Sequence, residues 1–581
     1  MLNPLQTTSP LILFEDEHLL VINKPPGINT HAVNIDGSAG IYDWLRHREP
    51  RWATLATHQR LDKETSGVLL FAKTREANQW LARRFELREV RKTYQLLTDR
   101  DPGQLPRRIK SQIYKAGGND FRTIEAHEDG RDADTEFQLV GREGEHWRIE
   151  AIPFTGRTHQ IRLHARDAGF PILGDETYGG SPFTRLCLHA HILELVHPIT
   201  REPIRFEAPV DFAADPHLQL RQTLWPEPKV GVQASACSLQ SNYPPLPDSL
   251  EVELQLATTN AWRLIHGASD DQPGWYVDRL GDYLLSQSEL TIAQPQQALL
   301  ERWTKALGLK GAYHKQLDRH VRKSSPTQAS PALLFGEAAP ERFEIVENGV
   351  RYGLSFAEGY SVGLFLDQKD NRRRLLTGHV GREFTEGRCS PRPGRTDAQP
   401  GDRNVALPFN VLNTFAYTCG FSVCAALAGA TVTSLDLSRK YLDWGRDNFR
   451  WNQLDPEQHD FIFGDCFDWM KRLAKNSRTF DLVLLDPPTF SQSKESGVFK
   501  ADKDYGDLVD LALKLLAPDG LLFCSTNCAT LRPEPYLETI RAAVLRRGRA
   551  ITQEFFAPQP PDFPTSREEQ GYLKTVWLRI K

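Results

Sequence analysis

The sequence has no apolar run of the roughly 20 residues that a helix needs to cross a bilayer. Residues 1–10 also lack a basic start followed by an apolar core. The formal net charge is only −4, so there is no uniformly positive field of the kind that marks a general nucleic-acid coat. We therefore predict a cytoplasmic protein without a membrane partner, in which any contact with nucleic acid is local.

Cysteines are few and scattered. The eight cysteines include no CxxC pair and form no dense framework. This spacing argues against a disulfide scaffold and against a structural zinc site, and it predicts reduced thiols and no metal.

The chain is too long for one hydrophobic core, because it has 581 residues of ordinary globular composition. Residues 1–210 alternate short β-rich runs with a helical stretch, which predicts an α+β domain with a mixed, largely antiparallel sheet. Residues 211–249 are rich in Pro, Ser, Gln and Asn and are expected to be a linker. Residues 250–346 suggest a small α/β module, and residues 347–581 alternate strands and helices as a Rossmann-like parallel sheet does. Within the last domain, residues 385–403 are expected to be a mobile insertion.

The first candidate site centres on Asp62, within residues 58–67, on a loop directly before an apolar strand. A lone Asp there is more often a turn residue, because its side chain satisfies nearby backbone donors. Two later segments favour a functional role, residues 91–94 (RKTY) and residues 156–175, which contain GRTHQIRLH and GFPILGD. Taken together, these motifs resemble the RluA-type pseudouridine synthases.

That resemblance covers roughly residues 13–209 and implies isomerisation of uridine in RNA without a cofactor. It makes Asp62 the essential carboxylate, acting either as a nucleophile or as the base that removes a ribose proton. It also implies that Arg162 pairs with Asp62 and keeps it ionised. Tyr94 would stack on the base, and Arg60 would fill the space of the flipped nucleotide. The simpler alternatives are a core aromatic for Tyr94 and a surface ion pair for Arg162.

The second candidate site lies at four strand ends. An apolar strand runs into residues 415–421, a second ends at Asp436, a third at Asp465, and a fourth at residues 486–488 (DPP). In a doubly wound sheet the ligand lies beyond these carboxyl ends, and an acid after the second strand binds ribose hydroxyls. The GxGxxG fingerprint of a dehydrogenase is absent, so the pattern favours a class I methyltransferase.

Residues 263–267 (RLIHG), 273–279 (PGWYVDR) and 363–372 (GLFLDQKDNR) extend the match, so that residues 251–581 closely resemble the ribosomal RNA methyltransferases RlmI and RlmK. The resemblance implies S-adenosylmethionine as cofactor and ribosomal RNA as partner. It also implies a role for each of nine residues. Asp436 would bind the cofactor ribose and Asp465 the adenine, Phe415 and Tyr417 would line the methionine side, Gln368 and Arg372 would close the pocket, and Asp486, Pro487 and Pro488 would face the base.

The methylated atom depends on a cysteine. Cytosine carbon-5 needs a Cys nucleophile to activate the ring, whereas guanine nitrogen-7 does not. Asn527 stands where the cytosine-modifying relatives place their Cys, although Cys528 is only one position away. Residues 486–491 and 436–444 also look more like the guanine enzyme, so we predict guanine nitrogen-7 and keep cytosine carbon-5 as the alternative.

A bifunctional enzyme acting on ribosomal RNA is thus the principal hypothesis. Cys419 stands where the group has Gly, and its side chain is expected to narrow the cofactor pocket. A methyltransferase half that only binds RNA is therefore one alternative, and a non-catalytic ribosome assembly factor is another. Basic residues near 83–92 and 107–110 are candidate phosphate contacts, and the oligomeric state is left open.

Overall fold

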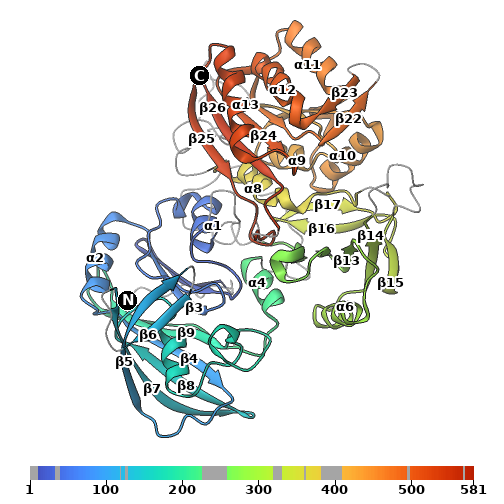
Figure 1. Cartoon of the computed structure of the whole chain (residues 1–581). Coiled ribbons are helices and arrows are strands. Elements are labelled where there is room, and N and C mark those ends of the chain that lie inside the picture. The colour runs from blue at the N-terminus through green and yellow to red at the C-terminus, as the bar shows by residue number, and fades with distance from the viewer. Residues whose placement is uncertain are drawn as a thin grey trace. The chain divides into compact units, whose positions relative to one another are not determined.

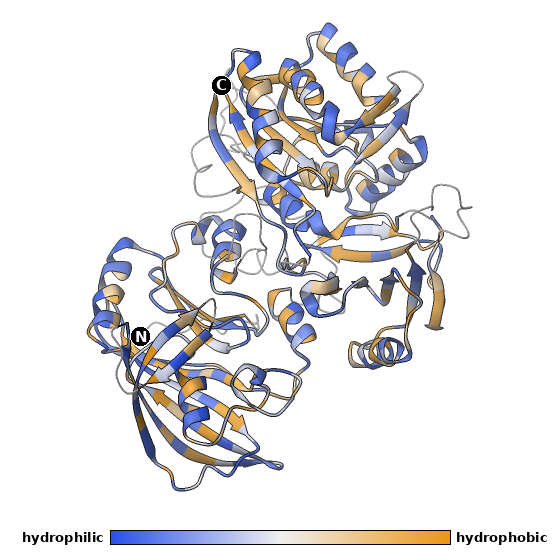
Figure 2. Ribbon diagram, in the orientation of Figure 1, coloured by the Kyte–Doolittle hydropathy of each residue, from blue (hydrophilic) through white to orange (hydrophobic). Residues whose placement is uncertain are grey.

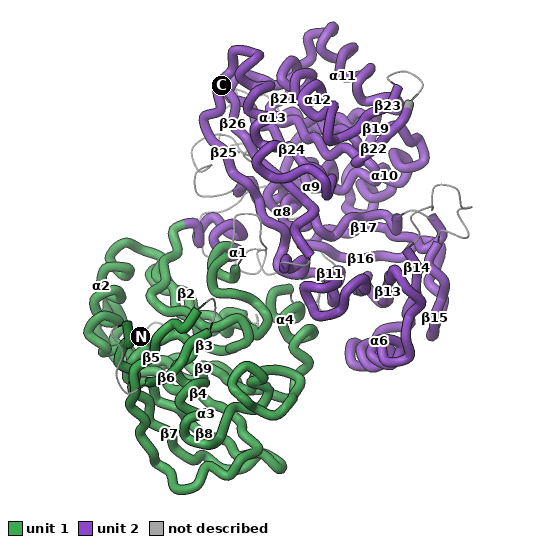
Figure 3. Tube along the Cα trace, viewed as in Figure 1, with its two compact units in different colours: residues 1–32, 40–43, 54–226 green, residues 33–39, 44–53, 227–581 purple. Residues whose placement is uncertain are grey.

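The computed structural model describes residues 11–32, 40–117, 120–124, 129–225, 258–317, 330–358, 361–380, 409–493, 497–566 and 569–581. The chain divides into two compact units, residues 1–32, 40–43 and 54–226 in the first and residues 33–39, 44–53 and 227–581 in the second (Figure 3). The expected insertion at 385–403 lies outside the described residues. No helix in the described ranges is long and apolar enough to cross a membrane.

The first unit is built on one sheet of ten strands (Figure 1). In spatial order these are β1 (Ile12–Glu15), β2 (Leu19–Lys24), β3 (Ser66–Ala72), β9 (Leu188–Val196), β4 (Arg91–Thr98), β8 (His146–Pro153), β7 (Arg131–Glu143), β5 (Arg107–Gly117) and β6 (Asp120–Ile124), with β10 (Pro203–Glu207) paired to β9. Among the strands that the structure describes in this sheet, only β3 and β9 pair in parallel. The helices of the first unit are α2 (Arg75–Glu86), α3 (Gln160–Asp167), α4 (Pro216–Leu224) and the first residues of α1 (Ile41–Arg48). The predicted mixed, largely antiparallel sheet is confirmed.

The parallel β3–β9 contact depends on Gly67. At this position φ is +113°, and an added Cβ would lie 2.2 Å from the carbonyl oxygen of Ala190 on β9. A side chain would push the two strands apart, so glycine is required where β3 leaves the Asp62 loop.

Part of the expected linker is helical. Asp215 begins α4 by accepting hydrogen bonds from the backbone N–H groups of His217 and Leu218, at 3.0 and 3.2 Å. The helix belongs to the first unit, so the connection starts later than composition suggested. Residues 226–257, the rest of that connection, lie outside the described residues.

The second unit contains a five-stranded sheet in the order β11 (Ala261–His266), β12 (Trp275–Leu280), β13 (Tyr283–Ser288), β14 (Gly311–Gln316) and β15 (Ala332–Gly336). Helix α6 (Gln294–Ala306) connects the parallel strands β13 and β14. A hairpin of β16 (Phe343–Glu347) and β17 (Val350–Leu354) follows. The expected boundary at 346/347 cuts β16, and one continuous hydrophobic core runs from this module into the next sheet.

The larger sheet of the second unit has seven strands in the order β20 (Asp460–Phe463), β19 (Thr431–Asp436), β18 (Asn410–Thr414), β21 (Phe480–Leu485), β24 (Leu516–Thr526), β26 (Lys574–Ile580) and β25 (Ile551–Ala557). Its helices are α8 (Lys369–Thr377), α9 (Gly420–Leu427), α10 (Arg439–Trp451), α11 (Cys466–Lys475), α12 (Ala501–Leu515) and α13 (Pro533–Arg546), and β22 (Phe490–Ser493) pairs with β23 (Gly497–Lys500). The first five strands run parallel and β26 runs opposite to them. This confirms the Rossmann-like prediction.

The strands of this sheet are mainly apolar and its helices have polar outer faces (Figure 2). All six residues of β26 after Lys574 are buried, and so is every residue of β21 except Asp481. The strand order reverses at β18, which has β19 on one side and β21 on the other. In open α/β sheets a ligand binds at such a reversal, beyond the carboxyl ends of the strands.

Two candidate active sites

Asp62 lies on the loop that enters β3, and its side chain is 31% exposed. The hydroxyl of Thr30 donates to the carbonyl of Leu61 at 2.8 Å and accepts from the Leu61 N–H at 3.1 Å. These bonds hold the backbone just before Asp62, so the carboxylate is presented from a fixed loop.

Lys24 holds the other side of the same loop. Its ammonium group donates to the carbonyls of Lys63 and Thr65, at 3.0 and 2.8 Å. Burial lowers the pKa of Lys24 to about 7, while the nearby charges of Glu64 and Asp62 oppose that shift. No sequence motif had pointed to Lys24.

Arg162 on α3 has two carboxylate neighbours. Its Nε and Nη2 each donate to Asp175 at 2.7 Å, whereas its Nη1 lies 3.6 Å from Asp62 Oδ2. The expected neighbour is thus within ion-pair distance, but the bidentate partner is Asp175. Asp175 was visible at the end of the quoted GFPILGD motif, and no role was inferred for it.

His159 also faces Asp62. Its Nδ1 is hydrogen-bonded to the hydroxyl of Tyr178 at 2.7 Å, and its Nε2 lies 3.8 Å from Asp62 Oδ2. Burial lowers the pKa of His159; the negative charges of Asp62 and Asp175 oppose this shift, and the positive charge of Arg162 adds to it. The ring therefore stays neutral at pH 7 and adds no charge beside Asp62.

Tyr94 lies on β4 between Ala151 of β8 and Ala190 of β9. Burial raises the pKa of Tyr94, and the negative charge of Asp62 raises it further, so the phenol stays protonated. Arg60 is exposed on the surface two residues before Asp62. The structure thus brings Asp62, Arg162 and Tyr94 together.

We expect Asp175→Asn to lower the rate of uridine isomerisation by about 10- to 100-fold, since removing a charge-assisted hydrogen bond costs about 1.5–3 kcal/mol. Arg162 would lose its bidentate anchor while Asp62 remains. The measurement is pseudouridine formed per enzyme under single-turnover conditions. Asp167→Asn is the matched control, because Asp167 pairs with Arg166 on the same helix but away from Asp62. A variant as fast as wild type would show that Asp175 does not position Arg162.

The second site is a cavity of about 1080 Å³ at the carboxyl ends of β18, β19, β20 and β21. That is the size of a pocket for a drug-sized cofactor. Of the nine residues expected here, the cavity lining includes Gln368, Phe415, Tyr417, Asp436, Asp465, Asp486, Pro487 and Pro488.

The acids at the strand ends are held by backbone N–H groups. Asp436 accepts from Tyr417 and Ser438, both at 2.8 Å, through different carboxylate oxygens. Burial raises the pKa of Asp436, and these two bonds oppose the rise. Asp465 begins α11 by accepting from the N–H of Asp468 at 2.9 Å.

The loop after β18 is strained. Phe415, Tyr417 and Cys419 have φ of 54°, 49° and 63°, a left-handed conformation that non-glycine residues seldom adopt. The expectation that Cys419 narrows the pocket is wrong. Its side chain is fully buried against Gly445 of α10, where an added Cβ would lie 2.3 Å from Cys419 Sγ, and Cys419 is not part of the cavity lining.

Gln368 and Asp486 lie together at one end of the cavity. Gln368 Nε2 donates to the hydroxyl of Ser525 at 2.8 Å and lies 3.3 and 3.4 Å from the two oxygens of Asp486. Burial raises the pKa of Asp486 to about 6, while the Ser525 hydroxyl opposes the rise.

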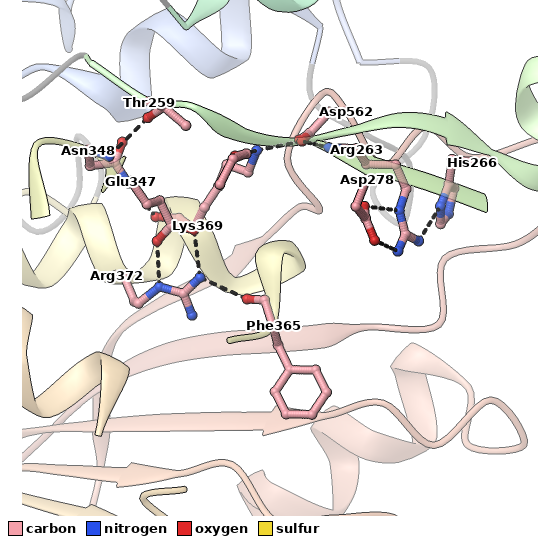
Figure 4. A network of polar contacts seen from close by, with 11 residues as sticks. Thr259, Arg263, His266, Asp278, Glu347, Asn348, Phe365, Lys369, Arg372 and Asp562 are labelled. Carbon is pink, nitrogen blue, oxygen red and sulfur yellow. Dashed lines mark hydrogen bonds and ion pairs between the residues drawn. The ribbon is translucent and has the colours of Figure 1, made fainter. Parts of the chain in front are cut away.

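Arg372 does not line the cavity, which corrects the expectation that it closes the pocket. It forms a buried bidentate ion pair with Glu347, at 2.6 and 2.8 Å, and donates to the carbonyl of Phe365 at 2.7 Å (Figure 4). Phe365 does line the cavity, so Arg372 acts on the pocket through that residue.

The thiols of Cys524 and Cys528 do not line the cavity near Asp486 and Asn527. Asn527 lines the cavity and accepts a hydrogen bond from the Thr489 hydroxyl at 2.7 Å. Neither Cys524 nor Cys528 is among the lining residues. Cys466 is the one cysteine among the described lining residues, and it lies beside Asp465. Among the described residues no three His, Cys, Asp or Glu side chains are grouped to hold a metal ion.

Comparison with known proteins finds relatives of both halves of the chain. Residues 18–167 match the RNA pseudouridylate synthase family, and residues 397–579 match the S-adenosylmethionine-dependent methyltransferase family. The ribosomal RNA large subunit methyltransferase I of Aeromonas hydrophila is 31% identical over 325 residues, which cover 55% of this chain and 75% of that protein. The ribosomal RNA large subunit methyltransferase of Deinococcus radiodurans is 29% identical over 327 residues, covering 55% and 73%.

Two solved structures are also similar. The SAH complex of SMU.776 is 27% identical, covers 61% of this chain and 83% of that one, and has a TM-score of 0.46. Human RNA pseudouridylate synthase domain containing 4 is 26% identical, covers 36% and 92%, and has a TM-score of 0.29.

The folds and sites therefore define an RNA-modifying enzyme with an N-terminal pseudouridine synthase domain and an S-adenosylmethionine-dependent methyltransferase domain. Through the latter, the chain belongs to the ribosomal RNA large subunit methyltransferase I family. The resemblances seen in the sequence are confirmed for both halves.

Proposed function

We propose that this chain isomerises a uridine of large-subunit ribosomal RNA to pseudouridine and methylates nitrogen-7 of a guanine in the same class of RNA. The observation that carries the choice of atom is the cavity end lined by Asp486, Pro487, Pro488 and Asn527, from which the thiols of Cys524 and Cys528 are absent. Large-subunit ribosomal RNA as the substrate is supported by the names of the relatives. Such a substrate implies a cytoplasmic enzyme.

In the first site, Asp62 supplies the carboxylate that attacks the nucleotide or removes a ribose proton. Arg162 Nη1 lies 3.6 Å from this carboxylate and places a positive charge beside it. Tyr94 stacks on the uracil, and Arg60 occupies the space of the flipped nucleotide. The reaction of this first domain needs no cofactor.

In the second site, Asp436 binds the ribose hydroxyls of S-adenosylmethionine and Asp465 the adenine amine. Phe415 and Tyr417 line the methionine side. The cofactor supplies an electrophilic methyl group on sulfur. Guanine nitrogen-7 has a free lone pair and needs no covalent help, whereas cytosine carbon-5 needs a thiolate adduct.

Substitution of the cysteines near the cavity tests which atom is methylated. Burial raises the pKa of Cys524, which lies on β24, and the Cys528 thiol is hydrogen-bonded with the Thr530 hydroxyl at 3.2 Å. We expect Cys524→Ser and Cys528→Ser to retain methyl transfer within about threefold, because neither thiol takes part in the chemistry. If either thiol were the nucleophile, its substitution would instead lower the rate of methyl transfer by at least about 10²-fold.

The direct experiment is nucleoside mass spectrometry and position mapping of ribosomal RNA from cells with and without this gene. We expect loss of one pseudouridine and one 7-methylguanine. A lost 5-methylcytosine together with an inactive cysteine variant would favour the cytosine alternative. If neither nucleoside changes, the assembly-factor alternative gains.

A further inference from the structure

Lys92 is a cation on the strand that carries Tyr94. It lies on β4 two residues before Tyr94, and both side chains are partly exposed, whereas Thr93 between them is buried. Side chains two residues apart on a strand leave it on the same face. The Lys92 ammonium group therefore lies on the same side of the sheet as the Tyr94 ring.

Two further motifs of the first site contact this ammonium group. Its Nζ lies 5.6 Å from the centre of the Phe85 ring, and Phe85 packs against the ring of His58 at 6.0 Å between ring centres. His58 begins the segment that carries Asp62. Gly156, where an added Cβ would lie 3.8 Å from the same Nζ, begins the motif that carries Arg162. The ammonium group thus lies where the three motifs of the site meet.

No described residue gives Lys92 a hydrogen bond or an ion pair. Its nitrogen is not among the buried polar atoms that lack a partner, so it keeps exposed surface that a ligand can reach. Burial lowers the pKa of Lys92, and no carboxylate among the described residues opposes that shift. A partly buried ammonium group without a counter-ion costs free energy, so this position favours an anion that a ligand brings.

The other basic residues that the sequence marked as candidate phosphate contacts differ from Lys92. Carboxylates pair with four of them: Arg84 with Glu89, Arg91 with Glu194, and both Arg108 and Lys110 with Asp134. Arg83 and Arg88 are exposed, where water solvates an unpaired charge at little cost. Among the described residues of these two basic stretches, only Lys92 is a partly buried cation without a partner.

We propose that Lys92 binds a phosphate of the RNA backbone next to the uridine that is isomerised. The inference rests on the isomerisation proposed above and is independent of the atom that the second domain methylates. An ammonium group has three donors and no acceptor, and it binds phosphate as a point charge. Phosphate contacts fix the position of a nucleic acid on a protein without reading its sequence.

Lys92 is a positioning residue in this scheme, and no bond forms or breaks at its nitrogen. Turning a uridine out of its helix costs free energy, because stacking and pairing are lost. A phosphate held on the Tyr94 side of the sheet fixes the backbone from which the nucleotide turns. The base can then reach Tyr94 while the ribose reaches Asp62.

The test is Lys92→Met in the full chain, with an RNA oligonucleotide that spans the mapped uridine. We expect the Kd for RNA to rise about 10-fold at low salt, the usual effect of losing a charge-assisted hydrogen bond. The slope of log affinity against log salt concentration should become shallower by about 0.7–0.9, because one phosphate contact is lost. The single-turnover rate at saturating RNA should change by less than about threefold, since the contact contributes to binding and not to the chemical step.

Three controls accompany this variant. Lys92→Arg should keep the Kd within about threefold, because a guanidinium group also binds phosphate. Arg100→Gln controls for the loss of one positive charge and should leave the Kd within about twofold, since Arg100 follows the opposite end of β4 and is 60% exposed. An uncharged methylphosphonate on one side of the mapped uridine should weaken binding by wild type and weaken binding by Lys92→Met no further.

An unchanged Kd and salt slope for Lys92→Met would overturn the inference. A weaker affinity with an unchanged salt slope would also overturn it, because Lys92 would then contact a carbonyl oxygen of the base. An equal fall of the unfolding midpoint in Lys92→Met and Lys92→Arg would assign Lys92 a structural role instead. If wild type binds the RNA but forms no pseudouridine, the proposed isomerisation fails, while the Kd values still decide the phosphate contact.

Discussion

Asp62→Asn is expected to abolish pseudouridine formation, with a fall of at least about 10³-fold in single-turnover rate. Asparagine keeps the shape of the side chain but can neither attack the nucleotide nor accept a proton at neutral pH. The loop should remain in place, because Thr30 and Lys24 hold it through backbone groups and not through the Asp62 side chain. RNA affinity, measured by filter binding, should change by less than about threefold.

Glu64→Gln is the matched control for this change. Glu64 lies on the same loop, its side chain is 46% exposed, and it has no place in the proposed chemistry. Methyl transfer by the second domain should be unaffected by either variant. If Asp62→Asn kept more than a tenth of the wild-type rate, Asp62 would not be the essential carboxylate, and the bond cleavage would need another residue.

Lys369→Met is expected to destabilise the second unit by about 3–5 kcal/mol, because it leaves a buried charge on Asp562 without its partner. Both side chains of this pair are 0% exposed (Figure 4). The N–H of Arg263 still donates to Asp562 at 3.0 Å, but one neutral donor does not replace an ammonium group. The measurement is the denaturant midpoint of the second unit, followed by tryptophan fluorescence.

The double variant Lys369→Met with Asp562→Asn should recover most of that loss, because both charges are then removed. Arg446→Ala is the control, since Arg446 and Asp443 form an exposed pair worth less than about 1 kcal/mol. A single variant that lost less than about 1 kcal/mol, or a double variant no more stable than the single one, would mean that water or a rearranged neighbour satisfies Asp562.

Both folds could be predicted from the sequence because strand and helix patterns are local. The four strands that end near residue 415, Asp436, Asp465 and Asp486 formed a parallel sheet, and the carboxyl ends of parallel strands necessarily meet at one edge. The strand-end rule placed the terminal acids at the cavity, whereas Gln368 came from the family resemblance, which also suggested Arg372, the one expected residue that does not line it. In the first unit, Asp62, Tyr94 and Arg162 were found through their motifs, which lie far apart in the chain.

The details that failed depend on which way a side chain turns. Cys419 itself has a left-handed backbone, and its side chain packs in the core against Gly445, so its bulk does not reach the cofactor side. Arg372 is held by Glu347, 25 residues earlier on β16. No local pattern reports such a partner, because it is set by how the hairpin packs on α8.

By itself the sequence determined the two domain folds, the order of the strands' terminal acids and the likeness to two RNA-modifying families, since periodicity and contiguous motifs are properties of neighbouring residues. Only the tertiary structure decided that Asp175 anchors Arg162, that Glu347 pairs with Arg372, and that Asp278 pairs with Arg263. Pairing between charges distant in the chain is settled by three-dimensional packing, where burial makes each unpaired group costly.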